Sequence, residues 1–184
     1  METVPKQEIE GRISKFQSSL EEMDLDGAFI LQNTDLFYFS GTIQSSVLFA
    51  PRQGEPILMV LKGFQRARQE STLKHVLPLA TKGQIKEMLE DFGFGGPKKM
   101  GLEMDVLPAN LYFWHQQTFP EYDWSNISSA IQKLRMIKTP YEVEQIKSAA
   151  RILHKGYLEI REIIREGMTE LEIDAHLALV ATVI

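Results

Sequence analysis

Acidic residues and histidines are the side chains of this sequence that could support acid–base or metal chemistry. Glu103 and Asp105 follow a short apolar run typical of a strand, and two neighbouring carboxylates can work as an acid and a base. Acids at the end of a strand are far more often exposed side chains without a catalytic role. We therefore expect Glu103 and Asp105 to be exposed, with a catalytic pair as the alternative.

The four histidines do not show the spacing of a metal site. His154 follows an apolar position of a long helix, which predicts a surface histidine. His176 stands four residues after Glu172, and this spacing suits a helical ion pair at least as well as a pair of ligands. His115 lies beside a tryptophan and His75 opens a strand, and the sequence names no catalytic partner for either.

Other catalytic motifs are missing from the sequence. The chain has no cysteine, which excludes a thiol nucleophile and disulfides, and it has no Gly-x-Ser-x-Gly elbow. The glycine-rich residues 93–97 follow a helix and precede a strand, the reverse of the order in a phosphate-binding loop. We interpret residues 93–97 as a turn, and we expect no assembled active site in this chain.

Composition narrows the class of protein. Of the 184 residues, 43% are hydrophobic and 24% are charged, which is ordinary for a globular protein. The net charge of −5 gives no basic surface for nucleic acid. The polar start lacks the apolar core of a signal peptide, and no apolar run approaches the ~20 residues of a membrane helix. We therefore predict a cytoplasmic protein that binds neither nucleic acid nor membrane.

The pattern of helices and strands predicts a mixed α/β sheet covered by helices, up to about residue 133. Residues 8–23 carry apolar side chains at helical spacing, whereas residues 28–31 form a short apolar run bounded by turn formers. Residues 51–55 suit a hairpin turn, and Pro78 favours an edge position for its strand. Strands are expected at 28–31, 46–50, 56–61, 75–79, 99–103 and 121–124, and helices at 8–23, 36–39, 63–71, 84–92, 108–119 and 127–134.

A strongly specified helix begins at Thr139. Thr139 is a good N-cap, Pro140 suits the first helical position, and Glu142 completes a capping box. The helix should run for about 26 residues, nearly twice the usual length. A second capping box joins Thr169 to Glu172 and opens a further helix. One apolar stripe follows the long helix, formed by Val143, Ile146, Ala150, Leu153, Tyr157, Ile160 and Ile164.

Residues 134–150, LRMIKTPYEVEQIKSAA, resemble the junction that leads into the catalytic domain of the pita-bread metallopeptidases. These are prolidase, aminopeptidase P and their non-peptidase relative creatinase. Residues 35–41 resemble the aspartate-x-x-tyrosine-x-x-glycine segment of that family, residues 101–105 its strand before a helix, and residues 167–172 its second catalytic-domain helix. The order and spacing of these segments agree with the family over nearly the whole chain.

The resemblance implies two parts. Residues 1–133 would form a creatinase/prolidase-type N-terminal domain with a ribonuclease H-like mixed sheet. Residues 134–184 would form a linker and the first two α-helices of a truncated pita-bread catalytic domain. The family holds a dinuclear metal site, with manganese, cobalt or zinc, and its five ligands lie beyond the second of these helices. The resemblance therefore predicts no catalytic residue and no metal ligand in this chain, which should be inactive alone.

Members of the family commonly form homodimers in which the N-terminal domain of one subunit reaches the active site of the other. By this resemblance, Tyr38, Ser40, Gly41 and Thr42 are candidates for a substrate- or dimer-proximal loop. The alternative is that Tyr38 lies in the core and Gly41 only ends a helix.

The leading hypothesis is the N-terminal, non-catalytic region of an Xaa-Pro peptidase-like metallohydrolase, which supports dimerisation and covers the active site. Two alternatives remain open. The chain could be a stand-alone binding or dimerisation module that uses the apolar stripe of the long helix. It could also be a fragment of a creatinase-like amidinohydrolase, which would share the fold.

Overall fold

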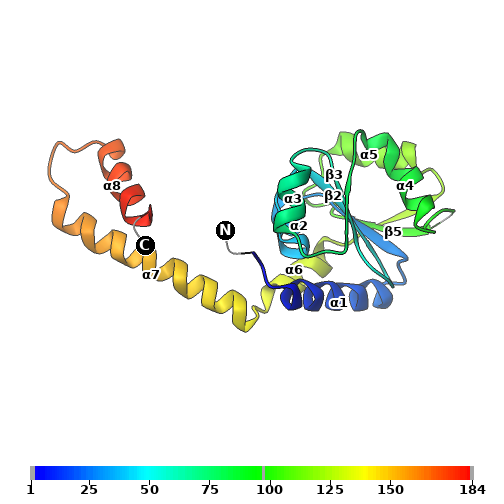
Figure 1. Cartoon of the computed structure of the whole chain (residues 1–184), viewed down its shortest axis with the longest axis horizontal. Coiled ribbons are helices and arrows are strands. Elements are labelled where there is room, and N and C mark those ends of the chain that lie inside the picture. The colour runs from blue at the N-terminus through cyan, green and yellow to red at the C-terminus, as the bar shows by residue number, and fades with distance from the viewer. Residues whose placement is uncertain (1–2, 97, 183–184) are drawn as a thin grey trace. The chain divides into compact units, whose positions relative to one another are not determined.

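The computed structural model describes residues 3–96 and 98–182, and it divides the chain into two compact units. The first unit is Met1–Met136 and the second is Ile137–Ile184 (Figure 1). The sequence predicts a division after residue 133. In the structure the last helix of the first unit, α6 (Ser128–Met136), continues to Met136.

A six-stranded mixed sheet forms the centre of the first unit, in the order β4-β3-β2-β1-β5-β6. Strands β1 and β2 and strands β2 and β3 pair antiparallel, whereas β4, β5 and β6 pair parallel to their neighbours. The predicted hairpin is confirmed as β2 and β3, and β4 lies at an edge as its proline indicates. The strands are β1 (Gly27–Ile30), β2 (Ser46–Pro51), β3 (Ile57–Val60), β4 (His75–Pro78), β5 (Lys98–Leu102) and β6 (Tyr122–Asn126).

Helices α1, α2 and α6 cover one face of the sheet (Figure 1). The apolar face predicted for α1 is buried, since Phe16 and Leu20 are fully inaccessible and the Phe16 ring packs at a tilt against Phe39 with ring centroids 4.9 Å apart. The helices of this unit are α1 (Lys6–Glu22), α2 (Asn33–Ser40), α3 (Phe64–Glu70), the 3-10 helix η1 (Lys82–Gln84), α4 (Ile85–Asp91), α5 (Ala109–Thr118) and α6.

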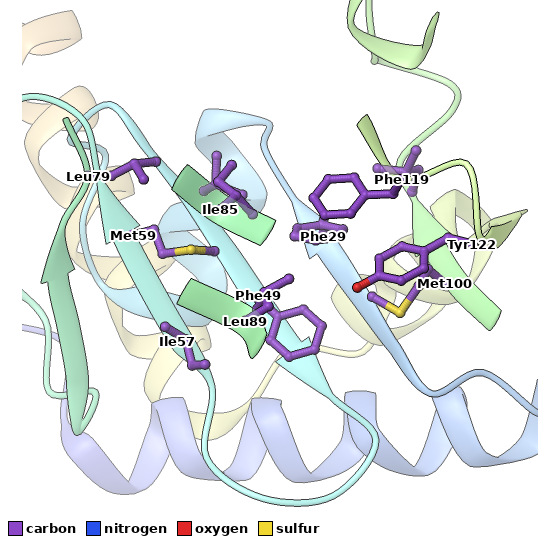
Figure 2. Close-up of a cluster of buried hydrophobic side chains, with 12 residues drawn as sticks. Phe29, Phe49, Ile57, Met59, Leu79, Ile85, Leu89, Met100, Phe119 and Tyr122 are labelled. Atoms are coloured by element: carbon purple, nitrogen blue, oxygen red, sulfur yellow. The ribbon is translucent and has the colours of Figure 1, made fainter. Parts of the chain in front are cut away.

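The opposite face of the sheet carries a second layer of buried side chains (Figure 2). Phe29 of β1 and Phe49 of β2 meet with centroids 5.5 Å apart, and Ile85 and Leu89 of α4 close over the cluster. Alternate residues of each strand therefore face opposite layers of helices, as the pleat of a sheet requires. The first unit thus has its own core on both faces of the sheet.

The second unit consists of two helices, α7 (Pro140–Ile163) and α8 (Glu170–Thr182). Both predicted capping boxes are present: Glu142 N–H donates to Thr139 Oγ1 at 3.2 Å, and Glu172 N–H donates to Thr169 Oγ1 at 3.3 Å. Helix α7 has 24 residues and ends at Ile163, slightly earlier than the predicted end at residue 166.

None of the helices in the described residues is both long and apolar enough to cross a lipid bilayer.

Candidate functional site

Three side chains from distant segments meet at one edge of the sheet. Asp35 lies in the first turn of α2, which follows β1; Glu103 comes directly after β5; and Arg135 belongs to the last turn of α6. Because β1 and β5 are neighbouring parallel strands, the segments that follow them lie side by side. This is also the edge at which open α/β sheets bind ligands.

Glu103 is buried, so the expectation of an exposed acid is wrong for this residue. Its side chain is only 1% exposed, and Oε2 accepts hydrogen bonds from Leu31 N–H at 2.6 Å and Gln32 N–H at 3.1 Å. Burial, together with the Asp35 carboxyl, raises the pKa of Glu103 to about 8 against the lowering effect of these N–H groups. These bonds explain the burial, because a carboxyl directly after β5 can reach the segment that directly follows the neighbouring strand β1.

Asp35 connects Glu103 to Arg135. Arg135 Nη1 donates to Asp35 Oδ1 at 2.6 Å, and the Asp35 side chain is about one-tenth exposed. Helix α2 begins earlier than the predicted residue 36, and its N-cap is Gln32, whose Oε1 accepts from Asp35 N–H at 3.0 Å. Asp35 is therefore released from capping and binds an arginine that is 100 residues away in sequence.

Asp105 does not pair with Glu103. It is exposed, as expected, and its carboxylate accepts from Gln132 Nε2 at 2.8 Å. Its N–H donates to Ser128 Oγ at 3.2 Å. Asp105 thus ties the loop after β5 to α6, and the catalytic pair considered for Glu103 and Asp105 is not formed.

The four residues predicted to lie near a substrate or a dimer partner form the C-terminal end of α2 and the loop behind it. Tyr38, Ser40 and Thr42 are buried within the first unit. The guanidinium of Arg12 lies 4.3 Å from the centre of the Tyr38 ring and donates to the Tyr38 carbonyl at 2.8 Å. Gly41 ends α2 with φ of +77°, a conformation that favours glycine. Their dimer or substrate role stays a prediction.

Hydrogen bonds hold this loop in place. Thr42 Oγ1 donates to Glu70 Oε2 at 2.7 Å, and Arg66 Nε donates to Glu70 Oε1 at 2.7 Å. The hydroxyl of Thr42 and then the charge and hydrogen bond of Arg66 lower the pKa of Glu70. Ser40 Oγ donates back to the Leu36 carbonyl at 2.6 Å. The loop is therefore fixed to α3.

Two apolar side chains beside this loop face the solvent, and the sequence reasoning missed both. Phe37 is 46% exposed and Ile43 is 58% exposed. They flank the buried segment of Tyr38, Ser40 and Thr42. An available signal was the alternation of buried and exposed positions in a short helix, which places Phe37 opposite the core-facing Leu36 and Phe39.

The histidines do not form a site in the described residues. His154 and His176 are exposed, as predicted for His154. His115 is 1% exposed; its Nδ1 lies 2.7 Å from the Leu111 carbonyl, and burial lowers its pKa. His75 packs edge-on against Phe92.

Residues 93–96 are confirmed as a turn, and Pro97 lies outside the described residues.

A cavity of about 260 Å³ beside this turn is lined partly by Asp26, Phe49 and Arg52. Asp26 Oδ1 accepts from Arg52 at 3.3 Å and Oδ2 from Lys99 N–H at 2.9 Å. Both acid oxygens of this cavity are therefore engaged by the protein itself.

Within residues 3–96 and 98–182, no group of three or more histidine, aspartate or glutamate side chains is placed to hold a metal ion. Asp35 and Glu103 are the buried carboxyls among these residues. Arg135 already occupies Asp35 Oδ1, and two backbone N–H groups occupy Glu103 Oε2. The residues present do not fit a dinuclear metal centre.

Comparisons with known proteins cover nearly the whole chain. Residues 12–137 match the family described as the creatinase/prolidase N-terminal domain. The chain is 26% identical over 170 residues to an Xaa-Pro dipeptidase of Pyrococcus furiosus, covering 89% of this chain and 46% of the relative. It is 33% identical over 92 residues to a creatinase of a Bacillus strain, covering 50% of this chain and 22% of the relative.

Similarity in structure confirms the predicted fold class. The prolidase from Pyrococcus horikoshii OT3 superposes with a TM-score of 0.80 at 20% sequence identity, covering 94% of this chain and 48% of that one. The chain therefore spans about half the length of the Xaa-Pro dipeptidases that it matches.

Proposed function

Because the chain belongs to the creatinase/prolidase N-terminal domain family, we propose that it is the N-terminal, non-catalytic region of an Xaa-Pro peptidase-like metallohydrolase. In this role it supports homodimer formation and covers the active site of a neighbouring subunit. The observation that carries the proposal is the match of 89% of this chain to 46% of an Xaa-Pro dipeptidase. The cytoplasmic location stays a prediction.

The chemistry of the described residues supports a non-catalytic role. The buried acids and the buried histidine are bonded within the first unit, and the exposed histidines are not gathered with carboxylates. A dinuclear centre of manganese, cobalt or zinc would then be supplied by the other half of a longer, relative-like protein. In that protein, this chain would act through its surface.

The surface beside the loop at residues 38–42 is our candidate for the dimer contact. Tyr38, Ser40 and Thr42 are buried, so they would support the contact from behind, with Gly41 setting the turn. Phe37 and Ile43 present the apolar area to a partner. Isolated exposed apolar residues are ordinary, but a pair that flanks a rigid loop is suited to an interface.

A hydrolysis assay tests the non-catalytic role. The purified 184-residue chain, supplied with manganese, is incubated with an Xaa-Pro dipeptide, and release of proline is measured. We expect no turnover above the protein-free control. Turnover on the order of 1 per second or more, as typical enzymes show, would refute the proposal.

Sedimentation equilibrium tests the dimer contact. We expect a concentration-dependent dimer that Ile43→Lys weakens at least tenfold, because a buried cation in an apolar contact is costly. The matched control is Phe113→Lys, which changes an apolar side chain of similar exposure, 56%, on α5. Equal effects of the two substitutions would place the contact elsewhere.

A stand-alone binding or dimerisation module is the second candidate, and the exposed face of α7 favours it. Ile146 is 55% exposed, Leu153 71% and Tyr157 60%, all on the apolar stripe predicted from the sequence. If this face mediates self-association, Ile146→Lys should shift the sedimentation profile to monomer. Gln145→Lys, an exposed neighbour on α7, adds the same charge beside the stripe and should leave the profile unchanged.

A creatinase-like amidinohydrolase parent shares the same fold and is favoured by the 33% identity to a creatinase. The gene sequence beyond the codon for residue 184 distinguishes between these candidate parent proteins and the stand-alone module. The leading proposal expects an open reading frame that encodes aspartate, histidine and glutamate ligands. A stop codon at that point would support the stand-alone module instead.

A further inference from the structure

We propose that Asp35 and Glu103 share one proton, and that this proton makes the anchoring of the α6 end by Arg135 dependent on pH. Arg135 is a positioning residue in this scheme, since it acts on the chain that leaves the first unit. The scheme lies wholly within Met1–Met136 and goes beyond the proposed function of the chain.

The hydrogen-bond pattern around Glu103 leaves one buried oxygen without a donor. Oε2 of Glu103 is occupied by the N–H groups of Leu31 and Gln32. Oε1 is fully buried, and the described residues offer it no donor. The neighbouring group is the carboxyl of Asp35, which cannot donate while it is ionised. A proton on Glu103 Oε1 solves this, because the resulting O–H donates to Asp35.

The same arrangement decides which acid holds the proton. Arg135 Nη1 donates to Asp35 Oδ1 at 2.6 Å, so the negative charge is best placed on Asp35. Glu103 is the more deeply buried acid and is therefore the one that stays neutral. Protonated Glu103, ionised Asp35 and cationic Arg135 then form one chain of donors and acceptors from β5 through α2 to α6.

The elements packed around Glu103 contribute few other charges. Helix α2 presents Asp35, α6 presents Arg135 to Asp35, and the segment between β1 and α2 presents the backbone N–H groups of Leu31 and Gln32. Loss of the proton to solvent would leave two carboxylates facing each other with one arginine. Glu103 is held in place by two N–H groups and cannot move away. Arg135 is 39% exposed, so water can replace Asp35 as its partner. Repulsion should therefore move Asp35 and weaken its contact with Arg135.

The sign of the pH effect follows from the proton count. Burial raises the pKa of Glu103 in the folded state to about 8, above its ordinary value of 4.5. Between these values the folded chain holds a proton that the unfolded chain has released. Stability should therefore fall as pH rises through this range and level off above the folded-state pKa. Within the range, the unfolding equilibrium constant should rise by at most about tenfold per pH unit.

Urea unfolding at several pH values tests the relay. Trp114 and Trp124 are the two tryptophans of the chain and both lie in the first unit, so fluorescence reports on this unit alone. From about pH 6 to about pH 8, the unfolding constant of the wild type should rise by up to about tenfold per pH unit. Glu103→Gln should remove this slope, because the amide NH₂ donates to Asp35 at every pH.

Amide hydrogen exchange, corrected for the intrinsic pH dependence, measures the anchoring itself. Protection of the last turn of α6 should fall over the same pH range in the wild type and stay constant in Glu103→Gln. Arg135→Met should make this turn equally exposed to exchange at all pH values. Gln132→Ala is the matched control on the same helix, since it removes the bond to Asp105 and should keep the wild-type pH dependence.

A pH slope in Glu103→Gln equal to that of the wild type would overturn the proposal. If this variant does not fold, carbon NMR of the Glu103 carboxyl in the wild-type chain replaces it. A titration midpoint well above 4.5, with a matching shift at the Arg135 side chain, supports the relay. A midpoint near 4.5, or no response of Arg135, overturns it.

Discussion

Helices α1 and α7 are both amphipathic, yet their apolar faces have opposite surroundings. In α1, Ile9 and Phe16 are at most 1% exposed, because the helix lies on the sheet. In α7, Leu153 and Tyr157 are 71% and 60% exposed. Helical periodicity therefore predicts which face of a helix is apolar, but not whether the same chain covers that face.

The capping signals at the starts of these two helices are opposite to their burial: the buried helix α1 has the weaker cap, and the exposed helix α7 has the stronger one. Helix α1 has Pro5 at its N-cap position and no side-chain capping bond, whereas α7 has a complete capping box at Thr139. Burial can stabilise a helix that lacks a cap, because most helical stability in proteins comes from tertiary packing. The stability of helix α7 depends more on local signals in its own sequence, such as this capping box.

The largest expected effect comes from truncating one apolar residue in each helix. Phe16→Ala should lower the free energy of unfolding by roughly 3–5 kcal/mol, because it opens a cavity in a core position. Leu153→Ala should change it by less than about 0.5 kcal/mol, since Leu153 is exposed.

Urea unfolding followed by circular dichroism measures both variants. The contrast between α1 and α7 would be refuted if Leu153→Ala lowered the free energy of unfolding as much as Phe16→Ala. That result would mean that the α7 face is covered in solution, and the sedimentation experiment would then show by what.

A pair of glycines offers a second contrast. A Cβ at Gly101 in β5 would meet the Ile127 side chain and the Cβ of Ala28, so Gly101→Val should cost about 1–3 kcal/mol through overpacking. A Cβ at Gly156 in α7 would meet Leu177 Cδ2 at 2.8 Å, which is the tip of a flexible side chain. Gly156→Ala should be neutral or stabilise by up to about 1 kcal/mol. Thermal unfolding of both variants measures the difference, and a strongly destabilised Gly156→Ala would show that α8 is held rigidly on α7.

The sequence predicts the elements of the first unit well because its local signals agree with its packing. The apolar residues of α1, the hairpin of β2 and β3 and the edge strand β4 all follow from spacing and turn chemistry. Glu103 could not be placed in this way, because its burial depends on Leu31 and Gln32, which are about 70 residues away. The contact of Arg135 with Asp35 likewise depends on how two parallel strands end side by side.

His115 and His154 extend the contrast to pH. Burial lowers the pKa of His115 below its ordinary 6.5, so the folded chain binds fewer protons there than the unfolded chain. The contribution of His115 to stability should fall as pH drops below about 6.5, by at most about 1.4 kcal/mol per pH unit, and it opposes the contribution of Glu103 in this range. His115→Phe should reduce this loss, whereas substitution of the exposed His154 by Gln should leave it unchanged. Urea unfolding from about pH 5 to about pH 7 checks this, and equal slopes in all three proteins would contradict the role of His115.

The smallest expected effect tests the local signals of α7. Thr139→Ala removes the oxygen that accepts from Glu142 N–H, and it should cost about 1 kcal/mol of helix stability. Pro5→Ala is the matched change at the start of α1, where no side-chain bond is lost, and it should have a smaller effect. Amide exchange in the first turn of each helix measures both changes residue by residue. Because α7 has little burial to compensate for a lost cap, faster exchange should spread beyond its first turn. Faster exchange confined to the first turn would show that packing, and not the capping box, holds the rest of α7.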